Sequence, residues 1–210
     1  MRAARHLAHA GAPPAAQQAA LIGILRADPT LMALLLALRP LALPQWRLVS
    51  GAVYQSVWNA LTGRAPGHGI KDYDVCYFDG DVSYEAEDRI IWQVAAATGP
   101  LGLPVETRNQ ARVHLWFEGR FGVPYEPLRS TDEGLARYAA KVHAIGVRLE
   151  ADGEISLAAP FGLDDLFSFV VRPNPVLANE GSYTEKAARA KALWPELTIL
   201  PWSGRSPAGP

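Results

Sequence analysis

Two aspartates interrupt a hydrophobic segment, IKDYDVCYF, whose pattern otherwise predicts a buried strand. Aspartate is depleted in strands, and a buried carboxylate is costly unless it is paired, hydrogen-bonded or bound to a metal. Because side chains alternate across a strand, Asp72 and Asp74 point to the same side. We expect Tyr73, Val75 and Tyr77 to face the core. A carboxylate pair of this kind can bind divalent cations and support phosphoryl transfer.

A third acidic residue, Glu106, also lies in a segment expected to be a strand, LPVETRN. If this strand lies beside the first, Asp72, Asp74 and Glu106 converge, and we predict them as catalytic and metal-binding residues. The expected cofactor is Mg²⁺ or Mn²⁺, because magnesium prefers oxygen ligands and completes its shell with water and phosphate. The alternative is an Asp-x-Asp pair on a solvated edge strand.

The residues upstream of the aspartates suggest a phosphate-binding turn. In LVSGAVYQSVWN a strand leads into a helix through small residues. The free N–H groups at a helix N-terminus bind phosphate, and a glycine lets the phosphate approach the backbone closely. We therefore predict that Ser50, through its hydroxyl, and Gly51 contact a bound triphosphate. A small residue at such a turn can also serve packing alone.

Three further polar residues are candidates for nucleotide contacts. Arg108 and Asn109 follow Glu106 directly, and arginine makes bidentate contacts with phosphate. Lys186 lies on a helix expected near the C-terminus, where its ammonium group could reach a triphosphate. For all three, the alternative is a solvated surface or a capped loop.

The elements that must position these residues indicate an α+β protein with a mixed β-sheet flanked by helices. Hydrophobic spacing, N-cap residues and Gly or Pro breakers define the elements. We expect helices over residues 14–39 with a break at 28–29, and over 51–61, 83–99, 130–141, 163–171 and 183–194, the last with Ser182 as its cap. Residues 110–122 are ambiguous between helix and strand. Strands are expected over 46–50, 71–78 and 103–109, with a hairpin turning at 152–153.

The composition is that of an ordinary globular protein, with 210 residues, 49% hydrophobic and 20% charged. The net charge of −1 gives no electrostatic basis for binding nucleic acid or an anionic membrane. A single cysteine, Cys76, excludes an internal disulfide framework and fits a cytoplasmic location, and we interpret it as a buried structural thiol. The apolar stretch LMALLLAL is too short to span a bilayer.

Four blocks of the sequence resemble nucleotidyltransferases of the DNA-polymerase-β-like superfamily: SGAVYQSVWN, KDYDVCYFD, VETRNQARVH and APFGLDDLFSFVVRPNP. More closely, the chain resembles small bacterial nucleotidyltransferase family proteins once grouped as a domain of unknown function. The resemblance implies a polymerase-β-like fold, two metal-binding aspartates on one strand and a third carboxylate, Glu106, on a following strand. The turn departs from the usual Gly-Gly or Gly-Ser, because here it is Ser50-Gly51-Ala52.

This resemblance also implies the domain organisation and the reaction. We expect an N-terminal helical segment at 1–45 packed on a nucleotidyltransferase domain at 46–201, and a disordered tail at 202–210. The expected reaction moves NMP from an NTP to a hydroxyl of a small molecule or protein, with no membrane or nucleic-acid partner. Two alternatives are a catalytically silent nucleotide-binding module and, less favoured, a glycosyltransferase whose Asp-x-Asp pair binds Mn²⁺ and a nucleotide sugar. Retention of three carboxylates argues against the silent module.

Overall fold

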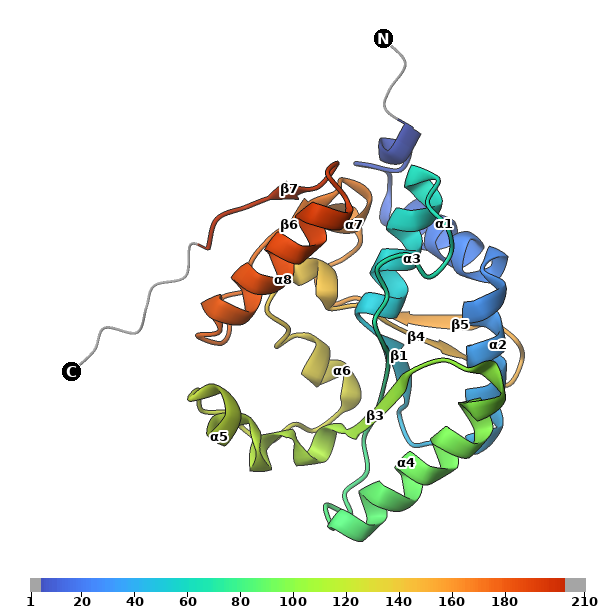
Figure 1. The fold of residues 1–210 in the computed structure, drawn as a ribbon, viewed down its shortest axis with the longest axis vertical. Coiled ribbons are helices and arrows are strands. Elements are labelled where there is room, and N and C mark those ends of the chain that lie inside the picture. The colour runs from blue at the N-terminus through green and yellow to red at the C-terminus, as the bar shows by residue number, and fades with distance from the viewer. Residues whose placement is uncertain (1–4, 203–210) are drawn as a thin grey trace, which may run out of the picture.

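A five-stranded mixed sheet forms the centre of the structure, a computed structural model that describes residues 5–202 (Figure 1). The strand order is β3-β2-β1-β4-β5. Strands β2 and β3 are parallel, whereas the other neighbours are antiparallel, which confirms the predicted mixed sheet. The strands are β1 (Arg47–Val49), β2 (Tyr73–Tyr77), β3 (Val105–Asn109), β4 (Gly146–Leu149) and β5 (Ile155–Ala158).

Helices surround this sheet, and a small two-stranded parallel sheet lies apart from it. The helices are α1 (Pro14–Ala27), α2 (Pro29–Leu38), α3 (Gly51–Thr62), α4 (Tyr84–Thr98), α5 (Phe117–Phe121), α6 (Thr131–Leu135), α7 (Asp164–Phe167) and α8 (Glu180–Leu193). The small sheet pairs β6 (Val170–Val171) with β7 (Thr198–Ile199).

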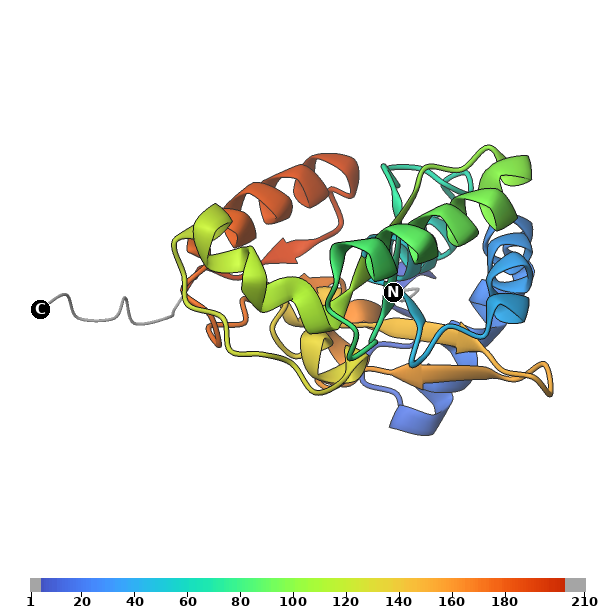
Figure 2. The same cartoon turned by 90° about the horizontal axis from the view of Figure 1, so that it is seen from below.

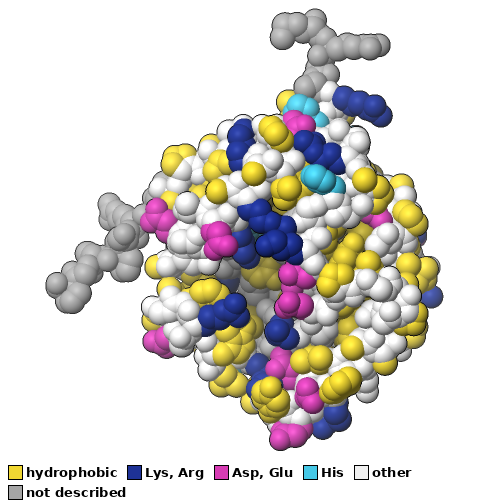
Figure 3. All heavy atoms as spheres, in the orientation of Figure 1, with side chains coloured by type: hydrophobic (Ala, Val, Ile, Leu, Met, Phe, Trp, Pro, Cys, Tyr) yellow, Lys and Arg dark blue, Asp and Glu magenta, His cyan; other side chains and the backbone are white. Residues whose placement is uncertain are grey.

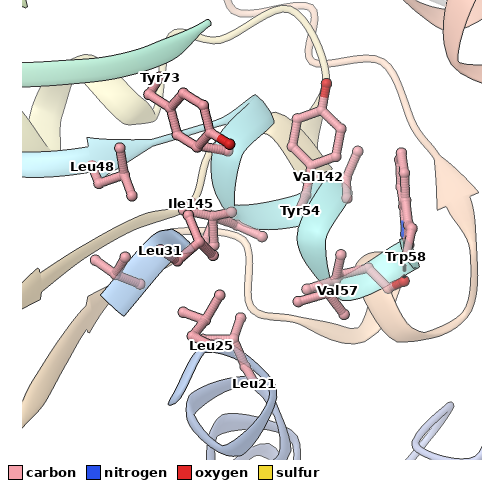
Figure 4. Packing of buried hydrophobic residues seen from close by; sticks show 14 of the residues in the cluster. Leu21, Leu25, Leu31, Leu48, Tyr54, Val57, Trp58, Tyr73, Val142 and Ile145 are labelled. Atoms are coloured by element: carbon pink, nitrogen blue, oxygen red, sulfur yellow. Dashed lines mark hydrogen bonds between the residues drawn. The ribbon is translucent and has the colours of Figure 1, made fainter. Parts of the chain in front are cut away.

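One face of the large sheet carries the main hydrophobic core. Figure 4 shows Leu21 and Leu25 of α1, Leu31 of α2 and Trp58 of α3 gathered with Tyr73 of β2 in this core. Tyr73, Val75 and Tyr77 are all buried, with at most 5% of each exposed. The predicted alternation of β2 is therefore confirmed, and the even-numbered residues of this strand face the other way.

The opposite face is only partly covered by apolar residues. A small cluster of Val49, Cys76, Leu135 and Ala144 packs there beneath α6. Gln110 donates an amide hydrogen to the Cys76 sulfur at 3.2 Å, and burial raises the pKa of the Cys76 thiol to about 12. This thiol stays protonated at neutral pH, in agreement with its interpretation as a structural residue. Figures 1 and 2 show α5 and α8 at the same end of the molecule.

Several local predictions are confirmed by hydrogen bonds. Asp28 separates α1 from α2, and its carboxylate accepts from the backbone N–H groups of Thr30 at 3.0 Å and Leu31 at 3.1 Å. Ser83 caps α4 by accepting from the N–H of Ala86 at 3.3 Å. Strands β4 and β5 form the predicted hairpin. The ambiguous residues 110–122 are largely helical, as a 3-10 segment (Gln110–Leu115) followed by α5.

Three predicted helices differ from the structure, two of them because distant residues compete for the backbone. The helix predicted over 163–171 ends at Phe167, since Val170–Val171 pairs with Thr198–Ile199. The helix predicted over 130–141 ends at Leu135, because residues 139–141 hydrogen-bond to residues 172–174 instead. The last helix begins at Glu180 rather than after Ser182, which therefore lies in its first turn and does not cap it.

Within residues 5–202 no single helix is long and apolar enough to cross a membrane. Only the pair Pro14–Ala27 and Pro29–Leu41, bent by 90°, reaches that length and hydropathy together. The division of the chain at residue 45 stays a prediction. Of the tail predicted to be disordered at 202–210, only Trp202 lies in the described part, and its ring packs 5.6 Å from that of Tyr183; residues 203–210 lie outside it.

Candidate active site

The predicted neighbourhood of the three acidic residues is confirmed at the level of the backbone. Asp74 is the second residue of β2, which has β1 on one side and β3 on the other. Its register partners are Val49 of β1 and Glu106 of β3. Paired residues on neighbouring strands lie roughly 5 Å apart and share a face of the sheet. The strand predicted over 71–78 is shorter in the structure, where β2 begins at Tyr73. Asp72 therefore lies directly before the strand, and Asp74 lies within it.

The positive charges near Asp74 do not offset its burial and its acidic neighbours. Burial and the negative charges of Asp72 and Glu106 raise the pKa of Asp74 to about 6, although Lys186 and Arg108 act in the opposite direction. Desolvation and like charges both disfavour the ionised carboxylate. A bound cation would reverse this penalty.

The turn between β1 and α3 has the geometry of a ligand-binding loop. Ser50 has φ 55° and ψ −119°, a conformation that residues other than glycine rarely adopt. The N–H of Ser50 donates to the Ile145 carbonyl at 2.8 Å. This hydrogen bond holds the turn against the start of β4. Within the described chain no side chain caps the start of α3. Among the described residues the N–H groups of Gly51 and Ala52, the first two of this twelve-residue helix, have no partner and are available to an anion, whereas that of Val53 donates to the Ser50 carbonyl.

Gly51 provides room rather than unusual backbone geometry. Its φ is not positive, and a β-carbon added there would lie 3.1 Å from the end of the Gln55 side chain. A larger side chain would project from the first turn of α3 into the space beside the helix N-terminus. The position is therefore suited to close approach by a ligand.

A cavity of about 250 Å³ connects this turn to the aspartates and to α8, and we call it the polar cleft. Its lining includes Ser50, Gly51, Asp72, Asp74, Lys71, Lys186 and Arg189. The side chain of Arg189 donates to the Gly69 carbonyl at 2.6 Å, which ties α8 to the loop before β2. Figure 3 shows basic side chains gathered next to acidic ones on this face, beside a hollow with an apolar lining. The polar cleft thus combines carboxylates with free helix N–H groups and three cationic side chains.

A nucleotidyltransferase family model matches residues 37–199 of the chain, which is most of its length. The chain belongs to this nucleotidyltransferase family. An NMR structure described as revealing a CCA-adding enzyme head domain has a TM-score of 0.68 and 25% sequence identity to it. That similarity covers 87% of this chain and 95% of the other. No curated protein matches the sequence significantly. The predicted polymerase-β-like nucleotidyltransferase fold is confirmed.

Not every predicted contact residue of this nucleotidyltransferase reaches the polar cleft. Asn109 is buried, and its amide is fully used: it accepts from the N–H groups of Asp79 and Ala111 and donates to the carbonyls of Asp79 and Asp81. Asn109 therefore stabilises the loop between β2 and α4, which contains Asp79 and Asp81. Arg108 lies at the far side of Asp74, where its guanidinium is 3.6 Å from the Glu106 carboxylate.

The acidic residues of the nucleotidyltransferase offer the oxygen ligands that Mg²⁺ and Mn²⁺ prefer. Glu106 is about half exposed and faces Arg108, and among residues 5–202 no three Asp, Glu, His or Cys side chains are placed to enclose an ion. Asp72 and Asp74 therefore fit a cation that takes its remaining ligands from phosphate and water, a common arrangement for magnesium. The three-carboxylate metal site stays a prediction.

Arg189, Gln55 and Tyr54 also line the polar cleft, and the sequence prediction did not include them. Arg189 lies three residues after Lys186 and so shares its helix face, a signal that was available in the sequence. Tyr54 and Gln55 lie in the hydrophobic α3, and nothing in their local pattern distinguishes them from core residues.

Proposed function

We propose that this chain is a metal-dependent nucleotidyltransferase that moves NMP from an NTP to the hydroxyl of a small molecule or protein. The observation that carries this proposal is the position of Asp74. It pairs in register with Glu106, follows Asp72 on the same side, and borders a cleft that opens on a helix N-terminus. The family and the similarity to a CCA-adding enzyme head domain support nucleotide transfer in general.

The polar cleft would bind the triphosphate. The N–H groups at the start of α3 and the Ser50 hydroxyl donate to phosphate oxygens, while Gly51 allows them to approach. Lys71, Lys186 and Arg189 supply positive charge around the same space. These groups hold the β- and γ-phosphates, which leave together as pyrophosphate.

Asp72 and Asp74 would hold the divalent ion, with Glu106 beside them. When bound, such an ion neutralises charge on the phosphates and lowers the pKa of the attacking hydroxyl. The acceptor oxygen forms a bond to the α-phosphorus as the bond from that phosphorus to the bridging oxygen breaks, and pyrophosphate departs with the electron pair. Glu106 is the carboxylate placed to receive the hydroxyl proton, because it is half exposed and lies beside Asp74.

The partners follow from the same features. NTP is the donor, and the net charge of −1 argues against a nucleic acid as acceptor. The single buried thiol is consistent with a reducing, cytoplasmic location. A silent nucleotide-binding module would have no use for carboxylates whose mutual repulsion raises the pKa of Asp74.

The direct test incubates the purified protein with each of the four α-labelled NTPs and Mn²⁺, together with a small-molecule extract. We expect label to appear on one protein or metabolite fraction, with release of pyrophosphate, for wild type and not for Asp74→Asn. Transfer that persists in Asp74→Asn would contradict the assignment of this residue. Absence of both nucleotide binding and label transfer with every NTP would contradict the proposed function.

A further inference from the structure

A second cavity of about 260 Å³ borders Asp74, and we call it the aromatic chamber. Its apolar lining comes largely from the segment after β3, with Trp116, Phe117, Phe121, Tyr125 and Tyr138. Figures 1 and 2 show this segment and α8 at the same end of the molecule, and residues of both line the chamber. The mechanism described above does not use this space.

The aromatic chamber and the polar cleft lie in sequence along two different elements. On α8, Ser182 lines the chamber, Lys186 lines both cavities and Arg189 lines the cleft. On β2 the order is reversed along the chain, since Asp72 lines the cleft, Asp74 lines both and Cys76 lines the chamber. Both elements therefore place the two cavities on opposite sides of Asp74 and Lys186.

The chamber contains buried polar atoms without partners. His143, in the short 3-10 turn Lys141–His143, is 2% exposed, and its Nε2 has no hydrogen-bond partner among the described residues. Its ring stacks on Tyr54 with centroids 4.9 Å apart, and burial lowers the pKa of His143 to about 3, so that the imidazole is neutral. The buried Oδ1 of Asn179 likewise finds no partner in residues 5–202. Buried polar atoms are nearly always hydrogen-bonded, so these atoms indicate a ligand.

The charges of the chamber differ from those of the cleft. Arg108 and Arg137 both line it, but each is paired. Arg108 lies 3.6 Å from the Glu106 carboxylate. Arg137 lies 3.1 Å from Glu133 and stacks over the ring of Tyr125 at 4.6 Å. Lys186 and Asp74, which carry opposite charges, stand where the chamber meets the cleft. With its arginines paired and its other walls largely aromatic, the rest of the chamber suits an uncharged ring rather than a second polyphosphate.

The geometry of in-line displacement indicates whether this ring belongs to the NTP or to the acceptor. The attacking oxygen must approach the α-phosphorus from the side opposite the leaving pyrophosphate. If the polar cleft holds the pyrophosphate portion, the chamber across Asp74 lies on the side of attack. Glu106, the carboxylate proposed to receive the proton, is on β3, and Arg108 and Gln110 at the end of that strand line the chamber.

We propose that the aromatic chamber binds the acceptor, and that this acceptor is a small molecule with a hydroxyl on a flat, uncharged ring system. The inference rests on the proposed function, because it requires the triphosphate to occupy the polar cleft. The chamber volume lies just below the roughly 300–1,000 Å³ of ordinary ligand pockets, which suits one or two rings. His143 and Asn179 would hydrogen-bond to the ring edge, and the hydroxyl would point toward Asp74.

The test measures equilibrium binding of two flat probes, uridine and N-acetyltyrosinamide, and two non-planar probes, glycerol and myo-inositol. Each is titrated into the full chain with Mn²⁺ and a non-hydrolysable NTP, and alone. The variant is Trp116→Ala, whose side chain is at the chamber and 40% exposed; the matched control is Trp92→Ala, 69% exposed on α4 and outside both cavities. Phe121→Ala, also 42% exposed, serves as a second chamber variant.

We expect at least one flat probe to bind wild type and Trp92→Ala equally, and to bind both chamber variants about tenfold more weakly because a stacking surface is lost. The Kd for the NTP should be the same in all four proteins. Flat probes that compete with the NTP, or a chamber variant that weakens NTP binding, would instead assign the chamber to the nucleobase and overturn the proposal. So would equal binding of flat and non-planar probes, or no binding of either flat probe. Failure of the NTP itself to bind wild type would count against the proposed function. In that case the titrations without NTP would still show whether the flat probes bind the chamber and whether the chamber variants weaken that binding.

Discussion

Asp74 and Glu106 are register partners in the parallel pair of β2 and β3, so that residues 32 positions apart in the sequence present their carboxylates on one face of the sheet. That face lies opposite the main hydrophobic core and carries only a small apolar cluster, and it opens into two cavities that meet at Asp74. The relationship explains why aspartates interrupt an otherwise buried strand. Asp74 faces the two cavities, and the odd-numbered residues of β2 pack in the main core.

The raised pKa of Asp74 predicts a pH dependence of stability for the metal-free protein. The folded state holds the proton on Asp74 more tightly than the unfolded chain does, so this residue favours folding most below about pH 4. That contribution is lost as the pH rises to about 6. Asp74→Asn should therefore be more stable than wild type at pH 7.5, by at most about 3 kcal/mol, and about equal to it at pH 4.

Urea unfolding at the two pH values, in the presence of a chelator, measures this difference. Asp88→Asn, which removes an exposed carboxylate on α4, is the matched control and should change little at either pH. A wild-type stability at pH 7.5 equal to or above that of Asp74→Asn would show that Asp74 is not destabilised by its surroundings.

Gly51→Val tests the helix N-terminus as the triphosphate site. The position does not need a positive φ, and the nearest obstacle is the flexible end of Gln55, so the fold should be retained. The added side chain should nevertheless intrude on the phosphates and raise the Kd for NTP about tenfold or more. Gly23→Val, at an exposed glycine of α1 with open space around it and no positive φ, is the control for introducing valine. Isothermal titration with a non-hydrolysable NTP measures both; an unchanged Kd in folded Gly51→Val would contradict the assigned role.

Ser50 combines backbone strain with a hydroxyl, and two substitutions separate these features. Ser50→Gly should raise the free energy of unfolding by about 1 kcal/mol, because glycine adopts φ 55° without a side-chain penalty. Ser50→Ala keeps the strain and removes the hydroxyl, so its stability should match wild type. If the hydroxyl contacts phosphate, both variants should bind NTP more weakly. Greater stability of Ser50→Ala than of Ser50→Gly would refute the strain argument.

The sequence predicted the half of the site that depends on strand periodicity and local turns. Asp72, Asp74 and Glu106 could be placed because the parity of a strand fixes the face, and adjacent strands were expected from the order of the elements. Ser50 and Gly51 could be placed because a strand–helix turn is local. In each case the determining interactions lie within a few residues of the position, or follow from sheet geometry.

The other half of the site depends on where distant segments pack. Lys186 and Arg189 reach the cleft only because α8 lies across it. Their spacing places both on one face of the helix, but it does not show that this face borders a site. His143 lies in a short turn whose packing against Tyr54 joins residues far apart in the chain. Asn109 was assigned to the site from its neighbours, but its amide is occupied by hydrogen bonds to Asp79 and Asp81 of the loop between β2 and α4 and to Ala111. The aromatic chamber has no sequence signature.

The most direct test of the metal–nucleotide site is the melting temperature of wild type and Asp74→Asn as Mn²⁺ is raised at a fixed, saturating concentration of non-hydrolysable NTP. A ligand that binds only the folded state at a hundredfold excess over its Kd adds about 2.7 kcal/mol, which corresponds to a rise of roughly 5–10 °C for a chain of this size. We predict that rise for wild type, and a flat response for Asp74→Asn from a higher metal-free starting point. Identical Mn²⁺ responses in the two proteins would contradict the claim that these aspartates exist to bind metal.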